Sequence, residues 1–416
     1  MYFDEVKKNF GFGCMRLPMV ENGKAVDIEQ TKKMVDTFIE QGFNYFDTAH
    51  GYLEGKSELA LKECLTSRHK REEYILTDKL TMTYFNKQED IRPFFESQLE
   101  ACGVEYFDFY LMHSQSKDIF EHFKKCRAYE TALELKKEGK IHHFGISFHD
   151  KAEVLEEILK EYPQIEVVQI QFNYLDYEDP AVQSRKCYEV CRRYNKPVIV
   201  MEPVKGGNLV NLPEDAAKIL DNLNGGSAAS YAVRFAASFD GVMMVLSGMS
   251  NIEQMEDNIS YMKEFRALDD TEMTAVKAVA EVFNSKHMIA CTACRYCVEG
   301  AAGIARKLGI PQLIIGLTIV AMGTSMPEAA VSITAALNNN AGITIGNIVG
   351  SNILNILIIL GITAVITNVA IQKSTLLYEI PFMIGITALL LVFGLTGSSI
   401  TFIEGVVFLL LFIAFL

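Results

Sequence analysis

The fold is decided by three apolar runs that each end in an ionisable residue: Phe43-Asn-Tyr-Phe-Asp47, Tyr74-Ile-Leu-Thr-Asp-Lys79 and Tyr106-Phe-Asp-Phe-Tyr-Leu-Met-His113. Such short runs, rich in aromatic and β-branched residues, are typical of buried strands. Five similar runs lie at 11–17, 142–147, 167–173, 198–203 and 242–248. Longer stretches of helical period separate them, and glycine follows the first three of these stretches at positions 42, 103 and 139. Strand and helix alternating in this way over about 250 residues predict a (β/α)8 barrel.

Polar residues stand where the predicted strands end. They are Asp47, Lys79, His113, Ser147, Asn173, Glu202 and the pair Ser247 and Gly248. One lysine in such a position is usually a solvated charge, and one histidine is usually a structural residue. Repetition at successive strand ends is harder to explain by packing, and the chemistry of this barrel type sits at the C-terminal ends of its strands. We therefore expect one site there.

Tyr52 follows Asp47 by five residues and could act as a proton donor. A phenol ordinarily titrates near about pH 10, and a neighbouring ammonium such as Lys79 would lower its pKa. Asp47 could keep Lys79 charged, and His113 could hold a carbonyl oxygen by a hydrogen bond. This predicts general acid catalysis on a carbonyl that accepts a hydride, and the hydride must come from a cofactor.

Five segments resemble the aldo-keto reductase family, over about residues 10–258. They are Gly42-Phe-Asn-Tyr-Phe-Asp-Thr-Ala-His-Gly-Tyr52, Thr77-Asp-Lys79, Asp108-Phe-Tyr-Leu-Met-His113, Phe144-Gly-Ile-Ser147 and Val168-Gln-Ile-Gln-Phe-Asn173. The resemblance implies NAD(P)H-dependent reduction of an aldehyde or ketone to an alcohol. By it, Tyr52 is the general acid, Asp47 and Lys79 tune its pKa, and His113 orients the carbonyl of a small substrate. The alternative is a barrel that binds nicotinamide as a sensor and does not catalyse a reaction.

The same resemblance places the cofactor. Ser147 and either Asn173 or Gln169 would hold the nicotinamide carboxamide. Gly248, Gln254 and Asn258 would lie near the adenosine end. Members that use NADPH place lysine and arginine around its extra phosphate, yet the segment 247–258 has no basic residue. Because a phosphate without cations loses its strongest partners, we expect a weakened preference for NADPH and use of NADH.

Three cysteines follow the barrel with the spacing C-x2-C-x2-C: Cys291, Cys294 and Cys297. This spacing resembles the start of the ferredoxin-like 4Fe-4S tail of some aldo-keto reductases. The full motif would place a fourth cysteine where Ala301 stands. The run could hold a partial iron–sulfur cluster or zinc, and the alternative is a set of free thiols. The six scattered cysteines before it indicate a reducing cytosol.

The composition changes after residue 300. The only charged residues beyond it are Arg306, Lys307, Glu328, Lys373, Glu379 and Glu404, whose charges cancel. Residues 1–300 therefore carry the whole net charge of −13, which argues against nucleic acid as a partner. Apolar stretches at 310–337, 343–366, 380–394 and 401–416 predict membrane-spanning helices in contact with lipid. The few basic residues agree with a barrel on the cytoplasmic side.

Two polar motifs interrupt these apolar stretches: Gly323-Thr-Ser-Met-Pro-Glu328, and Gly346-Asn-Ile-Val-Gly-Ser-Asn352 with Asn355. Proline frees backbone carbonyls, and a carboxylate at membrane depth is costly unless it is functional. Oxygen ligands of this kind suit a hard cation. The motifs resemble the first α-repeat of the sodium/calcium exchanger superfamily. By that resemblance Thr324, Ser325, Glu328, Ser351 and Asn355 form half of a Ca²⁺ or Na⁺ site.

The family builds its ion site from two inverted repeats, and only one is present here. We therefore expect a fragment that is inactive alone unless a partner supplies the missing half. The predicted divisions are a barrel at 1–285, a cysteine-rich segment at 286–300 and a transmembrane all-α fragment at 301–416. This arrangement predicts a multi-pass membrane protein with a cytoplasmic barrel. If the junction near 300 is an artefact of joining, the barrel is expected in the cytoplasm. The alternative function is cation antiport regulated by a redox-sensing barrel.

Overall fold

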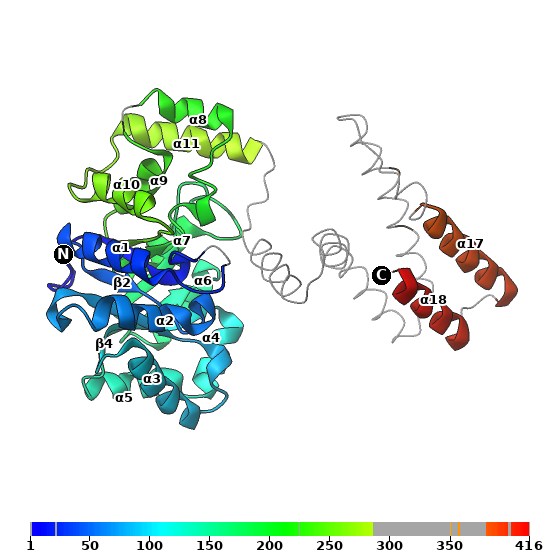
Figure 1. The fold of residues 1–416 in the computed structure, drawn as a ribbon, viewed down its shortest axis with the longest axis horizontal. Helices are drawn as coiled ribbons and strands as arrows, with labels where there is room; N and C mark the ends of the chain where they lie inside the picture. Colours follow the sequence, from blue (N-terminus) through cyan, green and yellow to red (C-terminus); the bar gives the residue numbers. More distant parts are fainter. Residues whose placement is uncertain are drawn as a thin grey trace. The chain divides into compact units, whose positions relative to one another are not determined.

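The computed structural model describes residues 2–20, 23–223, 225–285, 380–397 and 401–415, together with Gly350 and Leu357. Contacts within the chain separate two units, Met1–Ala290 and Cys291–Leu416. Figure 1 traces both, coloured from blue at the N-terminus to red at the C-terminus. The proposed boundaries at 285 and 300 stay predictions.

Eight parallel strands close into a barrel, in which each strand pairs with the next and β8 returns to β1. The strands are β1 (Phe10–Gly13), β2 (Tyr45–Asp47), β3 (Ile75–Leu80), β4 (Phe107–Gln115), β5 (Ile141–Phe148), β6 (Val167–Gln171), β7 (Val198–Met201) and β8 (Val242–Gly248). The (β/α)8 barrel predicted from the sequence is confirmed. β6 and β7 are shorter than predicted, so Asn173 and Glu202 lie in the loops that follow them.

Helices surround these strands (Figure 1). They are α1 (Ile28–Glu40), α2 (Lys56–Leu61), α3 (Gln88–Cys102), α4 (Lys117–Lys125), α5 (Ala128–Lys137), α6 (Ala152–Glu161), α7 (Ser184–Arg193), α8 (Glu214–Asp221), α9 (Ala228–Ala237), α10 (Ile252–Met262) and α11 (Asp270–Ser285). In α1, Asp27 caps the first turn by accepting a hydrogen bond from Gln30 N at 3.0 Å. Gly42 follows that helix with φ of 85°, a left-handed conformation that glycine adopts without a steric penalty.

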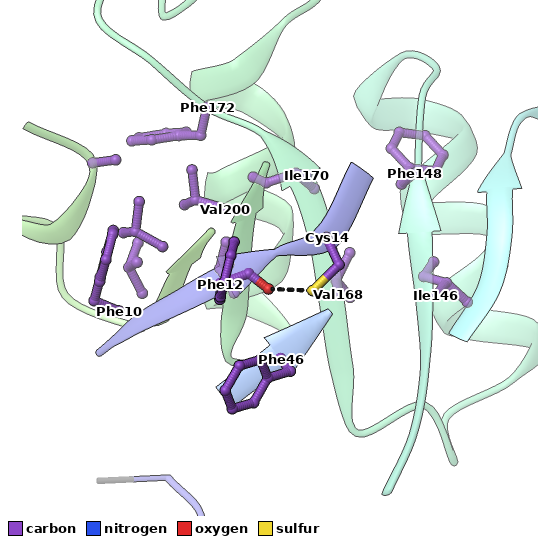
Figure 2. Packing of buried hydrophobic residues seen from close by; sticks show 14 of the residues in the cluster. Phe10, Phe12, Cys14, Phe46, Ile146, Phe148, Val168, Ile170, Phe172 and Val200 are labelled. Atoms are coloured by element: carbon purple, nitrogen blue, oxygen red, sulfur yellow. Dashed lines mark hydrogen bonds between the residues drawn. The ribbon is translucent and has the colours of Figure 1, made fainter. Parts of the chain in front are cut away.

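The core has two layers because successive side chains of a strand point to opposite faces. Inside the barrel lie residues such as Tyr45, Phe109, Val167, Ile199 and Met244. Between the barrel and its helices lies a larger cluster. Figure 2 shows part of it, with Phe10, Phe12 and Phe46 on β1 and β2, and with Val168, Ile170, Val200 and Phe172 on β6, β7 and the loop after β6. This packing fixes the strand ends on which the site is built.

The second unit is described only at two helices and two single residues. Phe393 of α17 (Ile380–Gly397) packs against Phe408 of α18 (Phe402–Phe415), with ring centroids 5.6 Å apart. Thr401 N and Thr401 Oγ1 both donate to the Glu404 carboxylate at 2.7 Å, which closes the first turn of α18. Within the described ranges, no helix has both the length and the apolar character needed to cross a membrane. The predicted spans at 310–337 and 343–366 lie outside these ranges, apart from Gly350 and Leu357.

Candidate active site

Lys79 stands at the centre of the site, at the inner face of β3. Its ammonium donates to Asp47 Oδ1 at 2.6 Å, to the Thr48 carbonyl at 2.7 Å and to the Tyr52 hydroxyl at 3.2 Å. Lys79 is fully buried and Asp47 nearly so. These three contacts use all three donors of the ammonium, so Lys79 is held rigidly. The structure thus brings together three of the residues singled out from the sequence.

The electrostatics of this group differ from the sequence-based expectation. Burial is the largest single effect and by itself would lower the pKa of Lys79, but the charges of Asp47 and Tyr52 and the hydrogen bonds to them together outweigh it, so the pKa is raised. Burial raises the pKa of Tyr52 above its ordinary value, and the opposing effect of Lys79 is smaller. The prediction that Tyr52 has a lowered pKa is therefore wrong for the net shift. Burial raises the pKa of the Tyr52 phenol by more than the nearby ammonium of Lys79 lowers it.

His113 lies beside Tyr52, with ring centroids 6.1 Å apart and ring planes nearly perpendicular. Its Nδ1 is 2.7 Å from Oγ1 of Thr81, which follows β3 directly. Burial, followed by the charge of Lys79, lowers the pKa of His113 well below its ordinary value. The imidazole is therefore neutral at physiological pH and presents one N–H donor. Thr81 was not recognised in the sequence, because nothing in a Leu-Thr-Met segment marks a hydroxyl partner.

The backbone after Tyr52 adopts an unusual conformation. Leu53 and Glu54 have φ of 52° and 58°, and Gly55 has φ of 83°. Non-glycine residues rarely enter this left-handed region, which costs roughly 1–2 kcal/mol each. The sharp turn connects the end of β2 to α2 within few residues, and it directs the Tyr52 hydroxyl back onto Lys79. Strain of this kind collects at functional sites.

A cavity of ≈ 320 Å³ runs across the C-terminal ends of β1, β2, β6, β7 and β8. Asp47 and Tyr52 line one end of it, and Gln254 and Asn258 of α10 line the other. Gln169 and Gly248 lie on its wall. Six residues from the predicted set therefore border a single elongated cavity.

The three residues predicted to hold a carboxamide differ in what they can still bind. Ser147 Oγ accepts from Ser114 N at 2.7 Å, so its own hydrogen can be donated. Gln169 Nε2 donates to Asp47 Oδ2 at 3.2 Å, and its oxygen can accept.

Asn173 differs from both, because its amide is occupied within the loop after β6. Its Nδ2 donates to Asp176 Oδ2 and to the Glu202 carbonyl, at 2.7 and 3.0 Å. Its Oδ1 accepts from Leu175 N and Asp176 N, at 3.1 and 2.9 Å. These four bonds saturate the side chain, which is fully buried. Asn173 therefore organises a loop, and these contacts favour Gln169 over Asn173 as the partner of Ser147 at a carboxamide, an assignment that stays a prediction.

The far end of the cavity is built around α10. Asn258 Nδ2 donates to Ser247 Oγ at 3.0 Å, and Tyr261 donates to Asn258 Oδ1. Gln254 Oε1 accepts from Ser250 N at 2.8 Å, and Asn251 caps the helix by accepting from Gln254 N at 2.9 Å. These bonds tie the end of β8 to the first turns of α10, whose N-terminus favours an anion.

Arg16 also lines this end of the cavity, and the sequence did not indicate it. The Ser250 hydroxyl donates to the Arg16 carbonyl at 3.0 Å. The carbons of the Arg16 side chain pass about 3.3 Å from where a Cβ on Gly248 would lie. No local motif could have revealed this cation, because β1 and β8 meet only when the barrel closes.

The loop after β7 forms the remaining wall. Glu202, Lys205, Gly206 and Gly207 all have positive φ, of 56°, 47°, 60° and 96°. The turn is closed by its own backbone, because Lys205 N donates to the Glu202 carbonyl and Gly207 N donates to the Val204 carbonyl, each at 3.0 Å. Lys205 is buried and pairs with Asp176, the same carboxylate that accepts from Asn173. The sequence marked only Glu202 in this loop.

Among the described residues, one buried group offers ligand atoms close enough for a metal: Glu58, Asp78 and Cys102, all within 4.8 Å of one another. Asp78 Oδ1 accepts from Lys79 N at 2.7 Å, and Glu58 accepts from Gln98 Nε2 at 3.3 Å. Burial, followed by the charge of Glu58, raises the pKa of Asp78 well above its ordinary value. Burial and the nearby charge of Glu58 therefore favour the protonated form of Asp78.

The other predicted ligands cannot be placed. Cys291, Cys294 and Cys297 lie outside the described residues, and so do Thr324, Ser325, Glu328, Ser351 and Asn355. Their proposed roles in an iron–sulfur cluster and a cation half-site stay predictions.

The fold and the site define a (β/α)8-barrel protein with a tyrosine, a lysine, an aspartate and a histidine at its strand ends. Residues 9–281 match the model of the aldo/keto reductase family, so the chain belongs to this family. The NADH-specific methylglyoxal reductase of Escherichia coli is 25% identical over 295 residues, covering 59% of this chain and 87% of that protein. An aldo-keto reductase structure from Klebsiella pneumoniae, in complex with NADPH, has a TM-score of 0.52 at 17% identity. It covers 65% of this chain and 90% of that one, and shows the same fold.

Residues 287–416 match the model of sodium/calcium exchanger proteins. The sodium/calcium exchanger MaX1 of Methanosarcina acetivorans is 42% identical over 122 residues, which is 29% of this chain. The chain covers only 35% of the length of MaX1. The match begins at residue 287, inside the segment for which a cysteine-rich start was predicted.

Proposed function

We propose that the barrel reduces a small aldehyde or ketone to an alcohol with NADH or NADPH. The observation that carries this proposal is the 3.2 Å contact between the Tyr52 hydroxyl and the buried ammonium of Lys79, at the edge of an elongated cavity. Membership of the aldo/keto reductase family supports an oxidoreductase. The NADPH complex of the Klebsiella pneumoniae structure supports a nicotinamide cofactor.

Tyr52 serves as the general acid. It gives its proton to the carbonyl oxygen, and the phenolate that remains is stabilised by Lys79, whose own charge is held by Asp47. Neutral His113 donates a hydrogen bond to the same oxygen and orients the carbonyl. A bound reduced nicotinamide supplies the hydride. The raised pKa of Tyr52 keeps it protonated across the physiological range, which suits a proton donor.

The cavity residues fit a nicotinamide dinucleotide. Ser147 and Gln169 each keep a hydrogen-bonding atom for a carboxamide near Tyr52. Gly206 and Gly207 of the loop after β7 border the same cavity, and because they have no side chains they leave room for the diphosphate. Gly248, Gln254 and Asn258 lie at the far end, where the adenosine half would bind.

The choice between NADH and NADPH depends on Arg16. The segment 247–258 has no basic residue, which favours a weakened preference for NADPH. The fold nevertheless brings Arg16 against Gly248, so one cation lies at this end of the cavity. Arg16→Ala should raise the Kd of NADPH more than that of NADH in titrations of both. A strong preference for NADPH that survives this substitution would contradict the proposed role of Arg16.

The test of the reductase is Tyr52→Phe, which removes one oxygen atom. Carbonyl reduction should fall by at least about 100-fold, in line with the loss of a positioned general acid, while the Kd of the cofactor should change little. Tyr84→Phe, at an exposed tyrosine of the neighbouring loop, is the matched control. Retention of most activity in Tyr52→Phe would remove Tyr52 as the acid.

For residues 301–416 we propose a membrane-embedded fragment of a cation exchanger, with the barrel on the cytoplasmic side. The match to exchanger proteins supports it, and Thr324, Ser325, Glu328, Ser351 and Asn355 would provide half of a Ca²⁺ or Na⁺ site. The full chain in vesicles should show no cation flux by itself, and Glu328→Gln should change nothing. A flux lost in Glu328→Gln would show that the fragment transports, with a partner or a second copy that completes the site. Recovery of the tryptic peptide 296–306 from a native membrane fraction would show that both parts occur in one chain.

A further inference from the structure

Thr81 is placed against His113 by the register of two neighbouring strands. In the parallel pair β3 and β4, Lys79 lies opposite Leu111 and Leu80 lies opposite Met112. Thr81 keeps an extended backbone, with φ of −104° and ψ of 131°, and so comes next to His113. The resulting distance from Thr81 Oγ1 to His113 Nδ1 is 2.7 Å, which is a normal hydrogen bond.

The direction of this hydrogen bond follows from the donors and acceptors that the imidazole and the hydroxyl have available. A neutral imidazole has one N–H donor and one bare nitrogen, whereas a hydroxyl can donate or accept. Across the described part of the chain, the bond to His113 is the one hydrogen bond that the Thr81 side chain makes. If Nδ1 carried the hydrogen, the Thr81 hydrogen would lack a partner at this contact. When Thr81 donates instead, Nδ1 accepts and the ring hydrogen sits on Nε2.

Hydrogen bonds of the backbone fix the chain at His113 and Ser114. The His113 carbonyl accepts from Gln115 Nε2 at 3.1 Å, and Ser114, with φ of 55°, donates from its N to Ser147. The Tyr52 ring stands perpendicular to the imidazole on the side of the cavity. Nε2 is thus the ring nitrogen left for a ligand, and only its protonated form can donate to a carbonyl oxygen.

We propose that Thr81 is a positioning residue that holds His113 in the Nε2–H tautomer and so presents a hydrogen-bond donor to the substrate carbonyl. The effect of Thr81 on catalysis rests on the proposed reductase function. The tautomer of His113 does not, because it is a property of the protein alone. A hydrogen bond of ordinary net strength shifts such an equilibrium by about threefold to tenfold.

The experiment measures the tautomer directly. In the full chain with ¹⁵N-labelled histidine, long-range ¹H–¹⁵N spectra distinguish Nε2–H from Nδ1–H, and His113→Gln assigns the signal. The wild type should show mainly Nε2–H. Thr81→Val keeps the shape and removes the hydroxyl, and should move the population toward Nδ1–H by about threefold to tenfold. Thr81→Ser should restore the wild-type pattern, and Thr83→Val, at an exposed threonine two residues away, should leave it unchanged.

Kinetics then connect the tautomer to catalysis. Thr81→Val should lower kcat for carbonyl reduction by a similar factor with little change in the Kd of NADPH, and Thr81→Ser should recover it. An unchanged tautomer in Thr81→Val and in Thr81→Ala would overturn the proposal even if activity fell. If the tautomer shifts but the wild type reduces no carbonyl, the positioning by Thr81 stands and the proposed function fails.

Discussion

The ammonium of Lys79 lies 2.6 Å from Oδ1 of Asp47, and both groups are buried, with Asp47 at the wall of the cavity. A charge without its partner in such a place is costly, because water cannot solvate it. Loss of either partner of this pair should therefore affect the stability of the barrel as well as its chemistry.

Removing one partner of that pair should destabilise the barrel strongly. Lys79→Met leaves Asp47 buried with Gln169 as its remaining partner, and Asp47→Asn leaves Lys79 with an uncompensated charge. Each single variant should lose about 3–5 kcal/mol in urea unfolding. The double variant should lose less than the sum of the two. Strictly additive losses would show that the two charges do not stabilise each other.

The rate of carbonyl reduction should change little with pH between about 6.5 and about 10, the ordinary pKa values of histidine and tyrosine. Burial raises the pKa of Tyr52, so the acid stays protonated until the pH exceeds its ordinary value. Burial also lowers the pKa of His113, so the imidazole is already neutral at the lower limit. Profiles of kcat/KM from about pH 6 to about pH 11 test this. An inflection near neutral pH that Tyr52→Phe or His113→Gln abolishes would contradict these assignments.

Glu58 should make the barrel less stable as the pH rises. Burial raises the pKa of Glu58 to about 7 from its ordinary value of 4.5. Its stabilising effect relative to the unfolded chain is therefore complete below about pH 4.5 and is lost as the pH rises through about 7. Glu58→Gln should remove this part of the pH dependence of Tm, and Glu96→Gln on the exposed face of α3 should not. Identical pH dependence in all three proteins would show that Glu58 does not titrate in this range.

Gly145 should tolerate no side chain. A Cβ on this residue of β5 would lie 2.6 Å from the Val167 carbonyl oxygen and 2.7 Å from Leu111 Cδ2. Gly145→Ala should cost at least about 1–3 kcal/mol, the usual range for overpacking. Gly139→Ala is a useful comparison, because nothing lies near its Cβ and the cost there comes only from φ of 76°. Its loss should stay near about 1 kcal/mol. Equal losses would show that β5 can move away from β6.

Much of the fold and part of the site could be predicted from the sequence. The eight apolar runs determined the barrel, because a strand buried on both faces needs continuous apolar residues and the helices between them need one apolar face. Asp47, Lys79 and His113 stood out because they end three of those runs, and Tyr52 stood out because it lies five residues after Asp47. Local patterns of this kind depend only on residues that are close in the chain.

The remaining features depended on residues that are distant in the chain and meet only in the closed barrel. Thr81 reaches His113 through the register of β3 and β4. Arg16 reaches Gly248 where β1 and β8 close the barrel. The saturated amide of Asn173 and the raised pKa of Tyr52 could not be foreseen either. Both depend on how much water the packed barrel excludes and on which partners it leaves, and desolvation is a property of the tertiary structure and not of the sequence pattern.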